Sequence, residues 1–258
     1  MRAELRDFLR FVRRPTFGPR LPRRPMHALA ADWLGCLDLR RIVRWVLLLW
    51  AVNFIVLGPL AAAAAMLAGA SHRFNAMVLP WFLALVWAPL MEELMFRLGM
   101  RRPGAALWLV PAFSLLVIHG RDLYTGIFLA VSLALVALPR PHGRGTRPRV
   151  APAFPWLPLL PGVRFSMLWN RRYRRIFPLV FHLASAIFAI LHLLNFSLGS
   201  MVWWLLPFLV LPQWVTGLVL GWLRVRSGIG ASMVAHSLFN AGPLAVVWLM
   251  MQAGLTTS

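Results

Sequence analysis

The stretch WVLLLWAVNFIVLGPLAAAAAMLAGA, residues 45–70, contains no charged side chain. At about 1.5 Å of rise per residue, a helix of this length is long enough to cross the roughly 30 Å of hydrocarbon in a bilayer. A surface helix of a soluble domain would carry polar residues along one face, and this run has almost none. The stretch therefore predicts a membrane-spanning helix.

Six more apolar stretches follow this one along the chain. They lie at about 77–98, 105–119, 124–138, 176–196, 201–223 and 229–252. The third and fourth of the seven are short, which fits either tilted crossings or partly re-entrant helices. Hydrophobic residues make up 60% of the chain, too large a share for a soluble domain to cover with polar groups. The sequence predicts an all-α fold, a polytopic transmembrane helical bundle of about seven membrane helices.

The charge pattern predicts the orientation of this bundle. All 27 basic residues are arginines, and the formal net charge is +20. They gather in the segments before and between the apolar stretches, so membrane topology explains them better than nucleic-acid binding does. With the N-terminus in the cytoplasm, only Arg73 and Arg121 fall outside. The positive-inside rule thus predicts a bacterial-type inner-membrane protein with a cytoplasmic N-terminus and a periplasmic or extracellular C-terminus.

The chain divides by composition into three parts. Residues 1–44 form a basic cytoplasmic or interfacial segment, residues 45–252 form the membrane domain with a basic cytoplasmic loop at 139–175, and 253–258 form a short tail. Residues 2–14 place apolar side chains on one helical face among arginines, which fits a helix on anionic lipids and equally a solvated basic tail. Trp45, Trp203 and Trp204 are candidate interfacial anchors.

Ionisable residues inside apolar stretches are costly and point to function. The second stretch ends in MEELMFR, residues 91–97. Glu93 and Arg97 are one helical turn apart and are expected to pair, as a structural clasp. Glu92 points about 100° away and has no such local cation, which suits a general base or acid.

Two other stretches each carry a polar pair at helical spacing. Phe188 and His192 lie four residues apart, with Asn195 following, and His236 and Asn240 lie four apart in the last stretch. Together with Glu92, these residues supply a carboxylate, two imidazoles and an amide, enough to activate a water and to stabilise an oxyanion. Single polar residues elsewhere are expected to make packing contacts, namely Asn53, Ser185 and Gln213, and His182 is expected to form a hydrogen bond between helices.

Three motifs occur in this order along the chain: Glu92-Glu93-x-x-x-Arg97, Phe188-x-x-x-His192 and His236-x-x-x-Asn240. Together they resemble the motifs of the CPBP family, the CAAX-protease and bacteriocin-processing family, which is also called ABI. Eukaryotic type II CAAX prenyl endopeptidases belong to that family. The resemblance covers about 77–102 and 176–245. One departure is the roughly ninety residues between the first and second motifs, which usually follow each other almost directly.

The resemblance implies an intramembrane endopeptidase, of glutamic or metalloprotease type. Glu92 and His192 would activate the water, while His236 and Asn240 would hold the oxyanion. Glu93, Arg97 and Phe188 would support them. By residue type, Glu92, His192 and His236 are also able to ligate Zn²⁺, and the sequence leaves this choice open. The implied partner is a membrane protein or lipidated peptide in a bilayer containing anionic lipids.

Other functions remain open from the residues alone. Buried Glu and His residues also occur in proton-coupled transporters, although no internal repeat supports that reading. A non-catalytic immunity or scaffold protein would keep the same fold. Ser232, one turn before His236, is the candidate nucleophile of a rhomboid-type serine protease, a reading that leaves the carboxylates unexplained. A haem-b membrane protein, with two of His182, His192 and His236 as axial ligands, is a further alternative.

Overall fold

The computed structural model describes residues 1–16, 32–33, 37–73, 79–119, 122–137, 167–198 and 203–254. Its α-helices are α1 (Arg2–Arg13), α3 (Leu39–Val52), α4 (Gly58–Leu67), α5 (Ala88–Phe96), α6 (Leu98–Arg101), α7 (Pro103–His119), α8 (Leu123–Ala137), α9 (Met167–Leu191), α10 (Leu206–Arg226) and α11 (Ile229–Gln252). Two π-helical turns, η1 (Asn53–Leu57) and η2 (Leu83–Trp87), precede α4 and α5, and 3₁₀ turns form at η4 (His192–Asn195) and η5 (Trp203–Leu205).

The predicted all-α membrane bundle is confirmed. In the described part of the chain, four helical segments are long and apolar enough to cross a bilayer: Leu39–Leu67, Arg171–Asn195, Trp203–Arg226 and Ile229–Gln252. The expected third and fourth stretches are the shorter apolar helices α7 and α8. The second expected stretch is interrupted, because α5 ends at Phe96 and a separate short helix, α6, follows Arg97.

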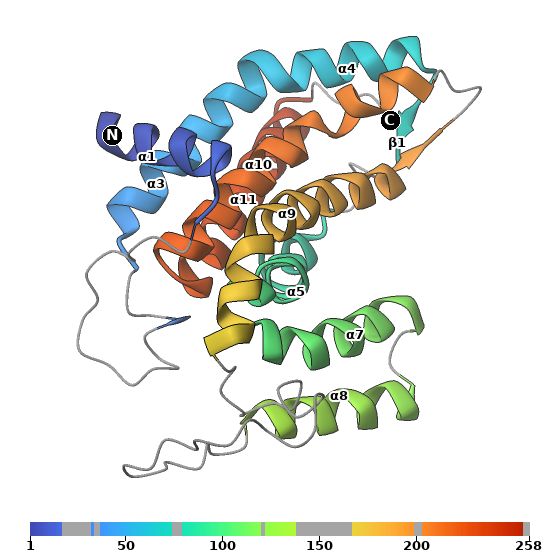
Figure 1. Ribbon diagram of the computed structural model, residues 1–258. Helices are drawn as coiled ribbons and strands as arrows, with labels where there is room; N and C mark the ends of the chain where they lie inside the picture. Colours follow the sequence, from blue (N-terminus) through green and yellow to red (C-terminus); the bar gives the residue numbers. More distant parts are fainter. Residues whose placement is uncertain are drawn as a thin grey trace.

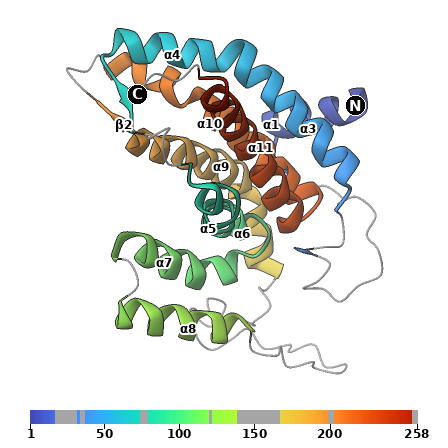
Figure 2. The same ribbon diagram turned by 180° about the vertical axis from the view of Figure 1, so that it is seen from behind.

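Helix α10 lies at the centre of the bundle. It packs against α1, α4, α6, α9 and α11, while α5 packs against α7 and α11. Figure 1 shows α3 and α4 as one long helical rod on one side of the bundle, with α7 and α8 stacked on the other side. Seen from behind in Figure 2, α8 again lies outermost, beyond α7.

A small two-stranded antiparallel sheet closes one end of the molecule. Strand β1 (Ser71–His72) follows α4 and pairs antiparallel with β2 (Phe196–Ser197), which follows η4. Gly69, at φ +61°, ends α4 in the left-handed conformation that glycine tolerates best. This sheet therefore ties the ends of α4 and α9 together, at the end of the rod opposite α1 (Figure 1).

Each π-helical turn precedes a proline. The turn η1 is followed by Gly58-Pro59 and the turn η2 by Ala88-Pro89. Proline lacks an N–H and its ring clashes with the carbonyl one turn earlier, so a wider turn lets the helix continue past it. In η2 the Ala88 N–H bonds to Leu83 O, and the next residue, Pro89, has no N–H to offer Ala84 O. The Ala84 carbonyl is thereby released for a partner outside its own helix.

Three expectations about helix limits and anchors were wrong. The first membrane helix begins at Leu39 rather than 45, and residues 167–175 of the expected basic loop belong to α9. Residues 139–166 of that loop lie outside the described residues. Trp45 is not an interfacial anchor, since only 1% of it is exposed and its ring lies 4.6 Å from that of Trp222. Long arginine side chains let a helix extend beyond its apolar core. Hydropathy alone therefore underestimates the length of such a helix.

The N-terminal helix α1 is docked on the bundle. Phe11 is buried, and the Phe8 ring packs edge-on against Trp45 and Trp222. Asp7 accepts hydrogen bonds from Arg226, at 2.8 and 2.9 Å, and from the Trp222 indole, at 2.9 Å. Protein contacts therefore hold α1 on the bundle, and the segment is not a solvated tail.

Residues 32–33 are also packed into the bundle, against the turn between α10 and α11. Asp32 forms an ion pair with Arg224 at 2.6 Å and with Arg102 at 3.0 Å. The turn needs glycine at Gly228, where φ is +113°, and at Gly230, where a Cβ would overlap the Trp33 carbonyl. The segment before the first membrane helix thus braces the start of α11, which carries His236.

The first prediction tests the docking of α1. Burial works to raise the pKa of Asp7, but its bonds to Arg226 and Trp222 outweigh this and hold the pKa below its usual value. The stabilisation is therefore complete above about pH 4 and is lost as the pH falls through the lower pKa of the folded state. We expect Asp7→Asn to loosen α1 at neutral pH, measured as faster trypsin cleavage within residues 2–14. Asp38→Asn, which removes the charge at the N-cap of α3 and leaves the Asp7 contacts intact, is the matched control; equal cleavage in both variants would contradict the role of Asp7.

Candidate active site

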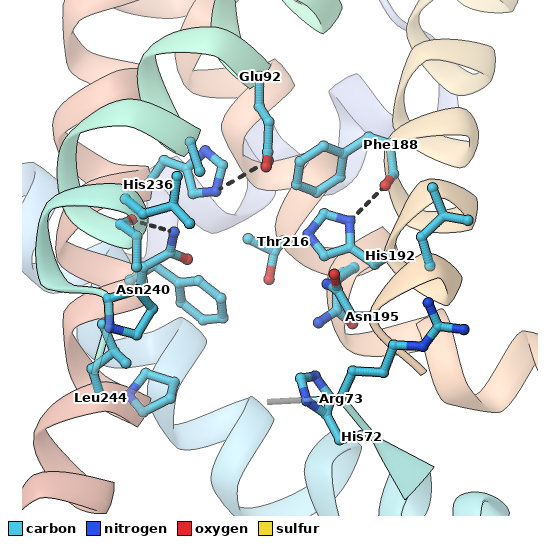
Figure 3. Close-up of a pocket in the computed structure, with 18 of the residues that line it drawn as sticks. His72, Arg73, Glu92, Phe188, His192, Asn195, Thr216, His236, Asn240 and Leu244 are labelled. Carbon is cyan, nitrogen blue, oxygen red and sulfur yellow. Dashed lines mark hydrogen bonds and ion pairs between the residues drawn. The ribbon is translucent and has the colours of Figure 1, made fainter. Parts of the chain in front are cut away.

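A cavity of about 590 Å³ opens between η2, α10, α11 and the end of α9. Glu92, His192, His236 and Asn240 all line it, so the structure brings together the four residues singled out from the sequence. Figure 3 shows Glu92 and His236 near one end, His72 and Arg73 at the other, and Thr216 between them. The remaining walls are mostly apolar, with Leu83, Phe239, Leu244 and Val247 among the lining residues.

Glu92 is the carboxylate that faces the cavity. Its side chain is 26% exposed, and Oε2 lies 3.7 Å from His236 Nε2, slightly beyond hydrogen-bond distance. Among the described residues, Oε2 has no hydrogen-bond partner. A partly exposed carboxylate beside an imidazole, lining a cavity large enough for water, is suited to bind and deprotonate a water molecule.

His192 presents one ring nitrogen to the cavity. Its Nδ1 lies 2.7 Å from the Phe188 carbonyl oxygen, and because a carbonyl only accepts, Nδ1 carries the proton. The neutral ring then has its lone pair on Nε2. His192 is the first residue after α9, in the 3₁₀ turn η4, so the end of the helix rather than its middle supplies this group.

His236 is held from behind by the other glutamate. Its Nδ1 lies 3.0 Å from Glu93 Oε1, and Nε2 lies on the side of Glu92. Glu93 has no exposed surface and also forms the expected ion pair with Arg97, at 3.2 Å. The two adjacent glutamates therefore have different surroundings: Glu92 faces the cavity, and Glu93 lies behind it.

Phe188 separates Arg97 from the two histidines. The Arg97 guanidinium lies 3.9 Å from the centre of the Phe188 ring, while that ring is 4.7 Å from His192 and 5.8 Å from His236. Gly217 allows this close packing, since a Cβ there would lie 3.1 Å from Phe188. The aromatic ring thus fixes both imidazoles and shares in the stabilisation of the buried cation.

Asn240 is linked to the π-helical turn η2. Its Nδ2 donates a hydrogen bond of 2.9 Å to Ala84 O, the carbonyl that Pro89 leaves without a donor. This bond uses one of the two amide N–H groups of Asn240 and orients the other. Sequence reasoning found Asn240 but had no means of finding this link, because it joins residues far apart in the chain.

The described structure does not favour a serine nucleophile. Ser232 is fully buried and is not among the residues lining the cavity, and its one hydroxyl proton is shared between two acceptors, Glu93 Oε2 and Leu220 O. His182 likewise does not line the cavity, and its ring packs against Phe181. The rhomboid-type interpretation loses its nucleophile, and His182 lies apart from the other two histidines.

Sequence reasoning missed His72, Arg73 and Thr216, which line the cavity together with Asn195 and Gln213. Burial and the neighbouring His192 lower the pKa of His72, which favours its neutral form. Gln213, expected to make a packing contact, also lines the cavity. A local signal existed for Gln213 and Thr216, since both are polar residues in an apolar stretch, three apart on one helical face.

The donor set does not form a compact metal site in this arrangement. Among the described residues, no three His, Cys, Asp or Glu side chains are grouped closely enough to hold a metal ion. Glu92, His192 and His236 line one cavity without converging on a common point, so they do not fit zinc as a three-ligand set.

Comparison with known proteins agrees with the motifs. The family model "Type II CAAX prenyl endopeptidase Rce1-like" matches residues 73–242, which include all the cavity residues named from the three motifs. No curated protein and no solved structure gives a significant match to the chain.

The second prediction concerns the buried pair of Glu93 and Arg97. Glu93→Gln leaves a fully buried guanidinium without its anion, and losing one partner of such a pair costs roughly 3–5 kcal/mol. We expect a lower Tm in detergent and poorer expression. The double variant Glu93→Gln/Arg97→Met should recover part of the Tm because no unpaired charge remains. A wild-type Tm for Glu93→Gln would show that this pair is not needed for stability.

Proposed function

The chain belongs to the type II CAAX prenyl endopeptidase Rce1-like family, and from that premise we propose that it hydrolyses a peptide bond of a membrane-associated protein or peptide. The observation that carries the proposal is Glu92, which lines a cavity together with His192, His236 and Asn240 and whose Oε2 has no hydrogen-bond partner among the described residues. A structural carboxylate in a membrane helix would be expected to have its lone pairs bonded, as those of Glu93 are.

In the proposed reaction, a water bound between Glu92 and His192 attacks the substrate carbonyl. Glu92 accepts the proton, while the lone pair on His192 Nε2 holds and orients the water. The tetrahedral intermediate collapses when the C–N bond breaks, and Glu92 returns the proton to the leaving amine. The products are a new carboxylate and a new amine. This water activation uses groups of the chain alone and makes the enzyme a glutamic-type protease.

The oxyanion of the intermediate needs hydrogen-bond donors on the opposite side. The second N–H of Asn240, oriented by the bond to Ala84 O, is one donor. His236 donates from Nε2 when both ring nitrogens are protonated, and the adjacent Glu93 carboxylate stabilises that cation. Donors fixed in advance in a site of low dielectric are the strongest means of stabilising such a charge.

The cavity rim supports a substrate that arrives from the bilayer. Leu83 and Leu194 line the cavity and yet are 52% and 70% exposed, so the entrance has apolar surface facing outward. The volume of about 590 Å³ lies in the usual range for binding a few residues or a small ligand. A peptide carrying a prenyl group, the substrate type in the family's name, fits an entrance of this kind.

Helix α1 supports a location beside anionic lipids. With Asp7 and Phe11 held by the bundle, its outer surface presents Leu9 surrounded by four arginines: Arg6, Arg10, Arg13 and Arg14. An exposed apolar side chain within a basic cluster is typical of helices on acidic leaflets. We therefore assign the α1 side to the cytoplasm.

The third prediction tests Glu92. Glu92→Gln keeps the side-chain volume and removes the base, so the variant should fold with a wild-type Tm and lose cleavage. The substrate is an internally quenched peptide with a farnesylated cysteine followed by three residues. Dialysis against EDTA should leave the wild-type rate unchanged; loss of activity restored by zinc would instead favour the metalloprotease type.

A proteomic comparison of wild-type and Glu92→Gln strains identifies natural substrates as membrane proteins that remain unprocessed. Wild-type cleavage by Glu92→Gln would contradict its role as the base, and the proton-coupled transporter would become the better explanation. Uptake into proteoliposomes would then be measured.

The fourth prediction concerns orientation in the membrane. In Figures 1 and 2, α1 lies at one end of the α3–α4 rod, and the end of α11 lies toward the other end of the rod, where β1 and β2 pair. Reporters fused after Arg14 and after Gln252 should therefore report a cytoplasmic and a periplasmic location, respectively, in line with the arginine distribution. Two reporters on the same side would contradict this orientation.

A further inference from the structure

The second glutamate has more partners than an ion pair requires. Glu93 Oε1 faces both Arg97 Nη1, at 3.2 Å, and His236 Nδ1, at 3.0 Å, while Oε2 accepts a hydrogen bond from Ser232. All four side chains are buried. One guanidinium is enough to balance the charge of Glu93, so the two bonds to α11 call for another explanation.

We propose that Ser232 and Glu93 are positioning residues for His236: they hold its ring with the Nδ1–H donated to Glu93 and with Nε2 directed to Glu92 and the cavity, where Nε2 donates to the oxyanion once it too is protonated. The inference rests on the proposed function, since it assigns the residues that act behind the oxyanion donor. Neither residue lines the cavity, so neither touches substrate.

The first step of the argument is the tautomer of His236. A carboxylate beside Arg97 is ionised and only accepts hydrogen bonds, so the proton between Glu93 and His236 belongs to Nδ1. Without this bond the ring has two tautomers and is free to turn about its side-chain bonds. With it, Nε2 has one direction, 3.7 Å from Glu92 Oε2.

The second step is the geometry of Ser232. Ser232 and His236 are i and i+4 on α11, so their side chains share one face of that helix. The Ser232 hydroxyl lies between two acceptors, Glu93 Oε2 from α5 and Leu220 O from α10, at 3.0 Å for the latter. It therefore connects three helices and fixes the plane of the Glu93 carboxylate, which in turn fixes the plane of the imidazole.

The third step is the ring contact on the other side of His236. The Phe188 ring packs edge-on against the imidazole, with centres 5.8 Å apart. His236 is thus held between an aromatic ring and a bonded carboxylate. A misplacement of about 1 Å in a catalytic group is able to cost about a hundredfold in rate, which is why such support matters.

The test compares Ser232→Ala, Ser232→Thr and a matched control, Ser185→Ala. Ser185 is also a fully buried serine, but its hydroxyl donates only to Phe181 O of its own helix. On the farnesylated peptide, we expect Ser232→Ala to lower kcat roughly 10- to 100-fold with little change in KM. Ser232→Thr, which keeps the hydroxyl, should restore most of kcat, and Ser185→Ala should match the wild type.

The double variant Glu93→Gln/Arg97→Met separates positioning from the structural clasp. If Glu93 positions His236, this variant recovers Tm relative to Glu93→Gln but stays slow. A double variant that regains both Tm and kcat, or a Ser232→Ala variant with wild-type kcat, would overturn the proposal. So would a loss of kcat in Ser232→Ala that Ser232→Thr does not rescue and that only parallels a fall in Tm.

A second measurement does not depend on cleavage. Nitrogen-15 histidine NMR of the full chain in detergent, with the His236 signals assigned from a His236→Gln sample, reports which ring nitrogen is protonated. We expect Nδ1 to be protonated in the wild type, both in the neutral ring and in the doubly protonated ring that donates to the oxyanion, and a mixture of the two neutral tautomers in Ser232→Ala. An unchanged spectrum in Ser232→Ala would overturn the inference, whereas a wild-type protein that cleaves no peptide would count against the proposed function only.

Discussion

A carboxylate without any exposed surface sits where α5, α10 and α11 meet, and the arrangement of the site depends on it. Burying the charge of Glu93 is affordable only with a cation and hydrogen bonds around it, and these come from Arg97, His236 and Ser232. Meeting those needs fixes how α11 is rotated against α5. That rotation directs His236 toward Glu92 and places Asn240 beside the turn η2.

Proline supplies a second constraint on the same helices. Pro89 forces a π-helical turn in the helix that carries the two glutamates, and the carbonyl it releases is the one that Asn240 binds. A local defect in one helix therefore becomes a specific contact with another. The same logic appears in α11, where Pro243 has no N–H for Phe239 O, and the Trp50 indole donates to that carbonyl at 2.9 Å. In a membrane such released carbonyls need protein partners, because lipid offers none.

The half of the bundle that contacts α1 is held by charge in a different manner. Arginines at the ends of α3, α6 and α10 pair with the few acidic residues of the N-terminal segment, with Glu4, Asp7 and Asp32 as the anions. These contacts tie the described N-terminal residues, 1–16 and 32–33, to the start of α3 and to the turn that begins α11. The N-terminal segment is thereby linked to the element that bears His236 and Asn240, although it lies far from the cavity.

What the sequence determined by itself is what depends on local spacing. The length of the apolar runs predicted the membrane helices, and the limits of α11 match the expected 229–252. Helical periodicity predicted that Glu93 pairs with Arg97 and that the neighbouring Glu92 lies in a different environment. Hydropathy failed where long side chains blur the edge of the membrane, at Leu39 and in the arginine-rich start of α9. Only the tertiary structure decided the partners across helices: Glu93 with His236 and Ser232, Asn240 with Ala84, α1 with Trp222, and the inclusion of His72 and Gln213 in the cavity. Those choices depend on how each helix is rotated and tilted against its neighbours, and the packing of the whole bundle sets these angles, whereas the pattern within a single helix does not.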